Sequence, residues 1–532
     1  MSEHTRELPR DIGIGYHHLR GRDDQVSLIV SPGRCHLPAN LRTWGWAAQL
    51  YATRSRSSWG IGDLGDLRTL NRWACSQGAG MTLVNPLHAS LTGLPQESSP
   101  YSPSSRCWRN PLYLRVEDVP GATAVEGFAA AQTAGRALNH SRHIDRDEVW
   151  RLKMGVLEEV WSAFRPDDAF TRFLEEGGEA LFGYATFCAL SEVHGRPWHG
   201  WPAELRAPGS RRVGEFVAAH RSRVLFHAWL QWLIDAQLEG SSGDVGVVQD
   251  LAVGVHPDGA DAWWWQGCFV STARVGAPPD EFNTQGQDWS LPPFDPWRLR
   301  AVGYEPFIRM VRHGLRHAAG LRIDHVMGLF RLFWVPIDGG GPADGGYVRY
   351  PAEDLLRILA LESVRAGAYV VGEDLGVVTD EARAALRDAG VLSYRLVWFE
   401  DDPPSAFPHH ALAAVTTHDL PTVTGLFSGA DLVRQRDLDM VPNDEGTAAM
   451  TERVATRAEI DGDDGTEAIV TKVHALLATA PSMILTATIE DAVAEPLRPN
   501  YPGVINADNW STALSKPLEE IMTDPLPNEI AT

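Results

Sequence analysis

Short apolar runs, each five to ten residues long, recur eight times along the chain. They are rich in Val, Leu, Ile and Ala and do not alternate with polar residues, which is typical of strands buried in a parallel sheet. Helical patterns separate many of them. This alternation of strands and helices predicts an α/β fold, a (β/α)8 TIM barrel. The runs are 45–52, 81–86, 244–253, 321–325, 368–374, 393–400, 412–419 and 482–491.

A long segment separates the second run from the third. Residues 87–243 are too many for a single crossover between strands, so we expect an insertion there. Apolar residues recur at three- and four-residue steps from Val149 to Phe164, and a second amphipathic stretch covers 224–238. The insertion is therefore predicted to be mainly helical. Two roles fit it equally: a subdomain packed on the barrel, or a wall of a substrate groove.

The ends of the chain differ from the barrel pattern. Residues 1–40 form a short N-terminal segment whose runs 12–20 and 27–32 suggest a hairpin, which we interpret as the remnant of an accessory β domain. We expect the catalytic barrel to cover 41–520, with 254–300 as a loop region beside the site, and 521–532 as a C-terminal tail.

Charge and hydropathy narrow the possible partners. The net charge is −22, with 47 Lys and Arg against 69 Asp and Glu, which argues against nucleic acid as a partner. The first residues contain no apolar signal core, and no run approaches the ~20 apolar residues of a membrane span. We therefore expect a soluble, cytoplasmic protein with no membrane partner.

Cysteine and lysine usage exclude further chemistries. The five cysteines are scattered and form no CxxC pair, which fits a reducing cytosol and favours neither a zinc ribbon nor a redox motif. Lysine occurs only at Lys153, Lys472 and Lys516, none of them at a predicted strand end. Schiff-base and pyridoxal chemistry need a buried active-site lysine, so both are set aside.

Three of the apolar runs end in carboxylates, at Asp324, at Glu373 with Asp374, and at Asp419. A parallel barrel gathers its chemistry at the carboxyl ends of its strands, so these acids are expected to meet. A charged carboxylate and a protonated one are the requirement of retaining glycosyl transfer. Any one of these acids alone would be interpreted as a cap or an ion pair, and such a structural role suits Asp374.

Neighbouring residues suggest which catalytic role each acid has. Arg322 precedes Asp324 by two positions, so on a strand both point to the same side and the arginine is expected to hold Asp324 ionised. Glu373 has an apolar strand behind it and Asp374 beside it, and both features would raise its pKa, as a proton donor requires. Asp419, after His418, is expected to hold sugar hydroxyls and to support a positively charged transition state.

Aromatic residues offer surfaces for sugar rings. The chain has 19 tryptophans, most of which we assign to the core. Trp289 ends the polar segment 278–289, where a core role is hard to explain, so it is the candidate for covering a sugar face.

Other interpretations of the same residues stay open at this point. Water instead of a sugar as the acceptor would make the protein an α-glucan hydrolase. The acids together with His325 and His418 resemble the ligand set of a metal-dependent sugar isomerase, although no HxH or HExxH spacing supports it. A glucan-binding scaffold without catalysis is a further alternative.

Several motifs resemble those of one family. They are SSWGIGDLGDL at 57–67, SSPYSPSSRCWRNPLYL at 98–114, GAPPDEFNTQGQDW at 276–289, LRIDHVMGLF at 321–330, VVGEDLGVVT at 370–379, TTHDLPT at 416–422, and LRPNYPG at 497–503 followed by Asn509 and Trp510. Together they resemble the 4-α-glucanotransferases, also called amylomaltases or disproportionating enzymes, of glycoside hydrolase family 77. The resemblance covers the chain from about Trp44 to Trp510.

The resemblance implies a barrel with inserted subdomains that transfers α-1,4-glucan segments between maltooligosaccharides, as a monomer or homodimer, without cofactor or metal. It also implies roles by position: Asp324 is the nucleophile, Glu373 the acid/base and Asp419 the stabiliser of the transition state. The substrate-binding residues that it implies are Arg322, His418, Tyr101, Asp258, Gln287, Trp289 and Asn500.

Overall fold

The computed structural model describes residues 11–20, 25–279, 286–376, 378–504 and 508–532. Within these residues, eight strands form one sheet in which every adjacent pair is parallel. A bridge between Val371 and Leu392 joins the first and last strands and closes the barrel. The strands are β3 (Thr43–Ala48), β4 (Met81–Val84), β7 (Gly246–Leu251), β10 (Gly320–Ile323), β13 (Tyr369–Gly372), β14 (Ser393–Leu396), β15 (Ala411–Ala414) and β16 (Ile484–Thr488).

The eight predicted runs each overlap one of these strands, with β3, β10 and β15 beginning one or two residues before their runs, and the predicted TIM barrel is confirmed. β4, β10, β13 and β15 are buried at every position, which explains why their sequences do not alternate. The strands are shorter than the runs because the last residues of each run leave the hydrogen-bonded ladder. Those residues form the loops at the carboxyl end of the barrel, and the acids stand there.

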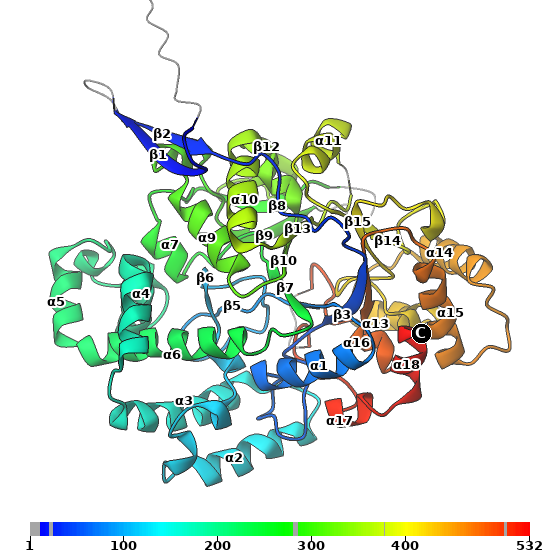
Figure 1. The fold of residues 1–532 in the computed structure, drawn as a ribbon, viewed down its shortest axis with the longest axis horizontal. Coiled ribbons are helices and arrows are strands. Elements are labelled where there is room, and N and C mark those ends of the chain that lie inside the picture. Colours follow the sequence, from blue (N-terminus) through cyan, green and yellow to red (C-terminus); the bar gives the residue numbers. More distant parts are fainter. Residues whose placement is uncertain (1–10, 21–24, 280–285, 377, 505–507) are drawn as a thin grey trace, which may run out of the picture.

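Helices surround the barrel, as Figure 1 shows. α1 (Leu64–Ser76) begins at Asp63, whose carboxylate accepts hydrogen bonds from the N–H groups of Gly65 and Asp66. Thr379 caps α11 (Asp380–Asp388), and its hydroxyl oxygen accepts a hydrogen bond from the N–H of Ala382. The other helices outside the insertion are α7 (Ala260–Trp264), α8 (Pro296–Ala301), α9 (Glu305–Leu315), α10 (Ala352–Ala366), α11 (Asp380–Asp388), α12 (Val423–Ser428), α13 (Ala430–Asp437), α14 (Asp444–Arg457), α15 (Thr466–Ala478), α16 (Ile489–Ala492), α17 (Leu518–Ile521) and α18 (Pro525–Ala531).

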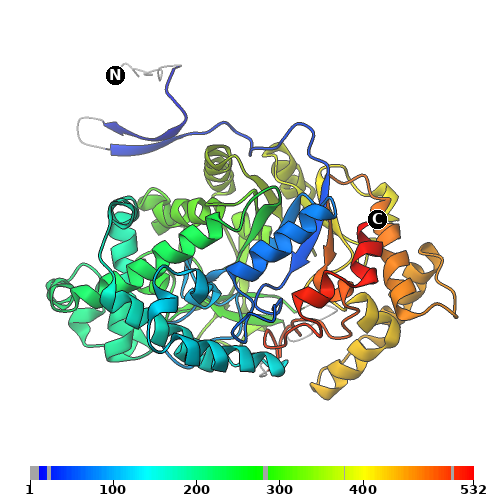
Figure 2. The same cartoon turned by 60° about the horizontal axis from the view of Figure 1, so that its bottom comes forward.

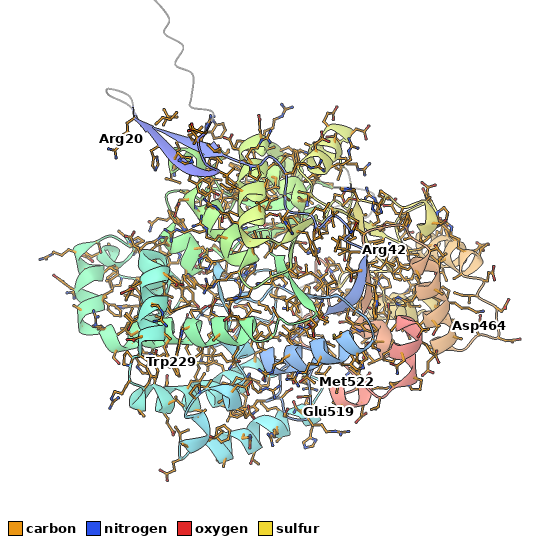
Figure 3. The ribbon with its side chains drawn as sticks, in the orientation of Figure 1. Arg20, Arg42, Trp229, Asp464, Glu519 and Met522 are labelled. Atoms are coloured by element: carbon orange, nitrogen blue, oxygen red, sulfur yellow. The ribbon has the colours of Figure 1, made fainter. Side chains whose placement is uncertain are left out.

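The segment between β4 and β7 is mainly helical. It contains the short hairpin β5 (His88–Ala89) and β6 (Ser105–Arg109), and then α2 (Phe128–Ala137), α3 (Arg146–Ala163), α4 (Asp168–His194), α5 (Arg211–Ala219) and α6 (Arg221–Glu239). Trp229 of α6, labelled in Figure 3, is buried against the rings of Trp161, Phe164 and Phe226. Aromatic packing of this kind joins α3 to α6, and their buried residues form one continuous core with α1 and the barrel strand β3.

A second, antiparallel sheet lies in the loops that follow the barrel strands. It has the order β12-β11-β8-β9, with β8 (Ala273–Ala277) and β9 (Gln287–Leu291) from the segment after β7, and β11 (Arg331–Pro336) and β12 (Gly346–Arg349) from the segment after β10. Gln287 and Trp289 therefore lie on a strand, where the sequence suggested a polar loop. Residues 280–285 of that segment lie outside the described residues.

The two ends of the chain pack on the barrel. β1 (Gly15–Arg20) and β2 (Gln25–Val30) form the predicted hairpin outside the barrel, as Figure 2 shows. The Tyr16 hydroxyl donates to Glu362 of α10 at 2.8 Å, which ties the hairpin to the helical layer. Residues 521–532, expected as a tail, include α18, whose Leu526 is buried.

Candidate active site

Asp324 and Glu373 are neighbours across two adjacent strands. β10 and β13 pair with Ile323 opposite Gly372, and each acid is the next residue of its strand. The ladder continues through them, because Glu373 N–H donates to the carbonyl of Ile323 at 2.9 Å. Strands in a sheet lie about 4.8 Å apart, so the backbones of the two acids lie side by side at this end of the barrel. His325, which follows Asp324, has φ +46°, and this turn ends β10 directly after the acid.

Arg322 is shared between two carboxylates, those of Asp250 and Asp324. Arg322 Nη1 donates to both oxygens of Asp250, at 2.7 and 2.8 Å, and its Nη2 lies 3.0 Å from Asp324 Oδ1. The i and i+2 spacing on β10 accounts for the contact with Asp324. Asp250 comes from β7, which pairs with β10 so that Asp250 stands opposite Arg322.

The sharing changes the electrostatics expected from sequence. Burial raises the pKa of Asp324 to about 6, and the guanidinium of Arg322 only partly opposes this. This value includes the charges of Asp250 and Glu373, which add to the rise. Arg322 acts in the expected direction, since it lowers the pKa of Asp324, but burial outweighs it and the arginine is shared with Asp250. Above pH 6 Asp324 is still mostly a carboxylate.

Glu373 is held by two backbone donors. Its Oε2 accepts from His325 N–H at 3.0 Å and its Oε1 from Leu375 N–H at 2.7 Å. Burial raises the pKa of Glu373, while Arg322 and the two N–H groups oppose the rise. The direction is the one expected for a proton donor, with burial as the main cause and Asp374 as a small one.

Asp374 has a different environment from Glu373. Its side chain is buried and Oδ1 accepts from the N–H of Tyr394 at 2.8 Å, with Arg395 at 3.6 Å. It thus joins the end of β13 to β14, which is the structural role that the sequence suggested for it.

Asp419 forms a separate charged group with His418 and Asn500. Asn500 Nδ2 donates to Asp419 Oδ1 at 2.6 Å, and His418 Nε2 lies 3.4 Å from Oδ2. Burial would raise the pKa of Asp419, but His418 and the Asn500 hydrogen bond outweigh it and lower that pKa. Burial would likewise lower the pKa of His418, and Asp419 outweighs it, so the pKa of the imidazole is raised. The Asp419 side chain keeps 43% of its exposure, which leaves it free to meet a ligand.

An aromatic group links the two charged groups. The Tyr101 hydroxyl donates to Asp250 Oδ2 at 2.6 Å, and its ring lies 4.9 Å from the ring of His418. Trp510 packs against both rings, at 5.3 and 5.1 Å. Tyr101 therefore connects the Asp250–Arg322–Asp324 chain to the His418–Asp419 pair.

The remaining candidates lie toward the loops. The Trp289 ring meets the ring of His325 edge-on at 5.4 Å, and its indole N–H donates to Gln287 Oε1 at 2.9 Å. Both residues thus stand on β9 beside the turn that follows Asp324. Asp258 lies in the loop after β7, 3.2 Å from His199 Nδ1, with no direct contact to the three acids among the described residues. It joins that loop to the helical insertion.

Two residues at the centre of the site are absent from the set that the sequence suggested. Asp250 is inside the predicted run 244–253, so the same rule of an acid on an apolar strand could have found it. Trp510 belongs to the closing motif, which by itself assigns it no role in the site. Its place behind Tyr101 and His418 depends on a contact across more than 400 residues of sequence, which no local pattern reports.

No helix among the described residues is long and apolar enough to cross a membrane. Among those residues, no group of three or more His, Cys, Asp or Glu side chains is arranged to hold a metal ion. Of the residues that suggested an isomerase, Asp324, Glu373 and Asp419 are engaged with Arg322, the His325 backbone N–H and Asn500 respectively.

Comparison with known proteins identifies the family. The model of glycoside hydrolase family 77, described as 4-alpha-glucanotransferase, matches residues 48–518. The chain belongs to this family. This confirms the resemblance seen in the motifs, and the match includes the three acids and the residues around them.

The similarity to individual relatives extends over nearly the whole chain. A 4-alpha-glucanotransferase of Mycobacterium tuberculosis is 41% identical over 98% of the chain and 80% of the relative. One from Haemophilus influenzae is 32% identical over 96% of the chain and 82% of its own length.

Solved structures show the same architecture. The amylomaltase of Corynebacterium glutamicum superimposes with a TM-score of 0.87 at 32% identity, covering 98% of this chain and 80% of that one. An amylomaltase of Streptococcus agalactiae in complex with acarbose has a TM-score of 0.77 at 17% identity, covering 92% of this chain and 98% of its own, and supports the fold.

Proposed function

We propose that the protein transfers α-1,4-glucan segments between maltooligosaccharides with retention of configuration, through a sugar ester on Asp324. The observation that carries this proposal is the side-by-side position of Asp324 and Glu373 at the ends of β10 and β13. Retaining enzymes need their two carboxyl groups about 5–5.5 Å apart, and neighbouring strands lie about 4.8 Å apart.

In the first half of the reaction, an oxygen of Asp324 attacks the anomeric carbon of the donor. The bond from that carbon to the glycosidic oxygen breaks, and Glu373 gives its proton to the departing oxygen. Arg322 holds the Asp324 carboxylate through Oδ1 and so orients it for attack. Burial supports the protonated form of Glu373 that this step needs.

In the second half, Glu373 is a carboxylate and acts as the base. It takes the proton from a hydroxyl of the acceptor sugar, whose oxygen attacks the anomeric carbon and releases Asp324. The two backbone N–H groups that hold Glu373 stabilise its charged form at this stage. One residue thus serves as acid and then as base.

We assign Asp419 to the hydroxyls and the developing positive charge of the reacting sugar. Its low pKa keeps it ionised, and its partial exposure leaves room for a ligand. We further propose that the sugar is bound by the remaining candidates of the sequence, namely Arg322, His418, Tyr101, Asp258, Gln287, Trp289 and Asn500. Trp289, with its ring beside His325, would cover a face of the sugar.

The test is the product pattern from purified protein and maltotriose, with and without a chelator. Transfer predicts glucose together with a ladder of longer sugars in both samples. Only shorter sugars would indicate hydrolysis instead, and activity lost with the chelator would favour the metal-dependent isomerase. Intact sugar binding without products would favour the non-catalytic scaffold. A cytoplasmic location and a monomeric or homodimeric state are part of the proposal and follow from the composition and the family resemblance.

A further inference from the structure

Glu490 is a buried acid beside the active site, and the proposed mechanism does not use it. It follows β16 directly, as the second residue of α16, and only 6% of it is exposed. It lines a small cavity of about 40 Å³ that Tyr101, Arg322 and His418 also line. Since about 10–15 Å³ is enough for one water molecule, the cavity has room for a hydroxyl group beside Glu490.

The carboxyl group of Glu490 has unused hydrogen-bonding capacity. Its Oε1 is buried and has no hydrogen-bond partner among the described residues. Gln49 Oε1, on the same cavity, is also without a partner there. Burying an acceptor without a partner costs free energy, so this wall favours a ligand that can donate and accept.

The neighbouring acid on the same helix is fully engaged. Asp491 Oδ1 accepts from Val423 N–H at 2.9 Å, and Oδ2 lies 3.2 Å from His474. Glu495, further along, is paired with Arg142 at 2.7 Å and does not line the cavity. Among these acids of the described chain, Glu490 alone faces the cavity.

The charges around Glu490 favour its neutral form. Its pKa is raised to about 7, mainly by burial; the charges of Asp491 and Glu495 contribute to the rise, while a backbone hydrogen bond and His418 oppose it. Asp250, Arg322, Tyr101 and Tyr394 also line the cavity, and the buried phenol of Tyr51 interacts with Glu490. Burial raises the pKa of Tyr51, and the charges of Glu490 and Asp419 add to the rise. A neutral carboxylic acid offers one O–H donor and a carbonyl acceptor, which matches a sugar hydroxyl.

We propose that Glu490 binds a hydroxyl group of the sugar in the active site as a neutral carboxylic acid, and that sugar binding retains the proton on it. This rests on the proposed function, because it places a sugar above the cavity. Binding removes water from Glu490 and so further disfavours its carboxylate. The affinity for sugar is therefore highest where Glu490 is protonated and falls as the pH rises past 7.

The test is calorimetry with acarbose, on the wild-type protein and on Glu490→Gln, which is permanently neutral. If only neutral Glu490 binds the sugar, deprotonation of Glu490 lowers the wild-type affinity by about tenfold between pH 6 and pH 8. Glu490→Gln lacks that fall, so it binds acarbose up to about tenfold more tightly than the wild type at pH 8 and within about threefold at pH 6. A merely structural role would not produce a gain of affinity.

A second readout uses the wild-type protein alone. At pH 7 to 8, sugar binding should be accompanied by proton uptake. The uptake appears as a dependence of the binding enthalpy on the ionisation enthalpy of the buffer. Fewer protons should be taken up when Glu490→Gln binds the sugar. Asp118→Asn, an acid paired with Arg68 on the helical layer, is the control and should keep the wild-type pH dependence. Equal pH dependence and equal proton uptake in wild type and Glu490→Gln would overturn the inference while leaving the transfer activity intact. Failure of the wild type both to bind acarbose and to act on maltotriose would overturn the proposed function, and the inference with it.

Discussion

The backbone N–H of His325 donates to Glu373 Oε2 at 3.0 Å, so the residue that follows Asp324 holds the carboxyl group of the other central acid. The end of β10 thus supplies one reacting group and positions the second. A displacement of this turn would move both, which is why the strained backbone of His325 belongs to the site as much as to the fold.

Asp324→Asn and Glu373→Gln should each lower the rate of transfer from maltotriose by at least about a thousandfold. The first removes the attacking carboxylate and the second removes the proton donor, and both changes preserve shape. Initial rates of glucose release check this, with melting temperatures to show that the variants fold. Turnover near the wild-type rate in either folded variant would contradict the assignment of that residue.

Asp250→Asn should shift the acidic limb of the pH profile to lower pH. Activity requires ionised Asp324, so kcat/KM rises with pH through the pKa of that group, which is about 6. Without the charge of Asp250, Arg322 interacts more strongly with the Asp324 carboxylate, and this lowers the pKa of Asp324.

The same variant should also lower the maximal rate, by up to about a hundredfold, because Arg322 and Tyr101 lose the partner that positions them. The control is Asp118→Asn, an acid paired with Arg68 on the helical layer, which should change neither quantity. An unshifted acidic limb in Asp250→Asn would show that Asp250 does not tune Asp324.

Asn500→Ala should make the enzyme more sensitive to acid and about tenfold slower. The Asn500 side chain donates to Asp419 and contributes to its lowered pKa, so its loss raises that pKa. Ionised Asp419 is then lost at a higher pH than in the wild type. Rates of transfer measured from pH 4 to 8 check this, and Asn528→Ala, at an exposed position on α18, should match the wild type. A variant slower by the same factor at every pH would point to lost sugar contacts alone.

Arg115→Met should destabilise the fold by about 3–5 kcal/mol, because it leaves the buried Asp66 without its cation and Asp63 with only Lys153, at 3.6 Å. Arg115 lies 2.7 Å from Asp63 and 2.5 Å from Asp66 at the start of α1, and these side chains are almost fully buried. Denaturant unfolding checks the value. Arg56→Met, which breaks an exposed pair with Glu520, should cost less than about 1 kcal/mol. Equal losses for the two variants would show that the buried network contributes little.

Local patterns were sufficient to predict much of the barrel. Its strands could be anticipated because a parallel strand buried on both faces needs a continuous apolar run, and each predicted run overlaps a strand. Arg322 and Asp324 were also within reach, since their contact depends only on the two-residue period of one strand. Trp289 was misplaced to a loop, because the polar residues before it hide a strand that exists only by pairing with β8.

By itself, the sequence determined which strands form, which acids end them and which family the chain belongs to, because these depend on residues close together along the chain or on long exact motifs. Only the tertiary structure decided which charged and polar side chains interact with one another. Arg322 is shared with Asp250, Glu490 Oε1 lacks a partner within the described chain, and Trp510 supports Tyr101, and each of these depends on side chains brought together from distant strands. Burial and neighbouring charges set the protonation states of these side chains, and neither can be predicted from the sequence of a single strand.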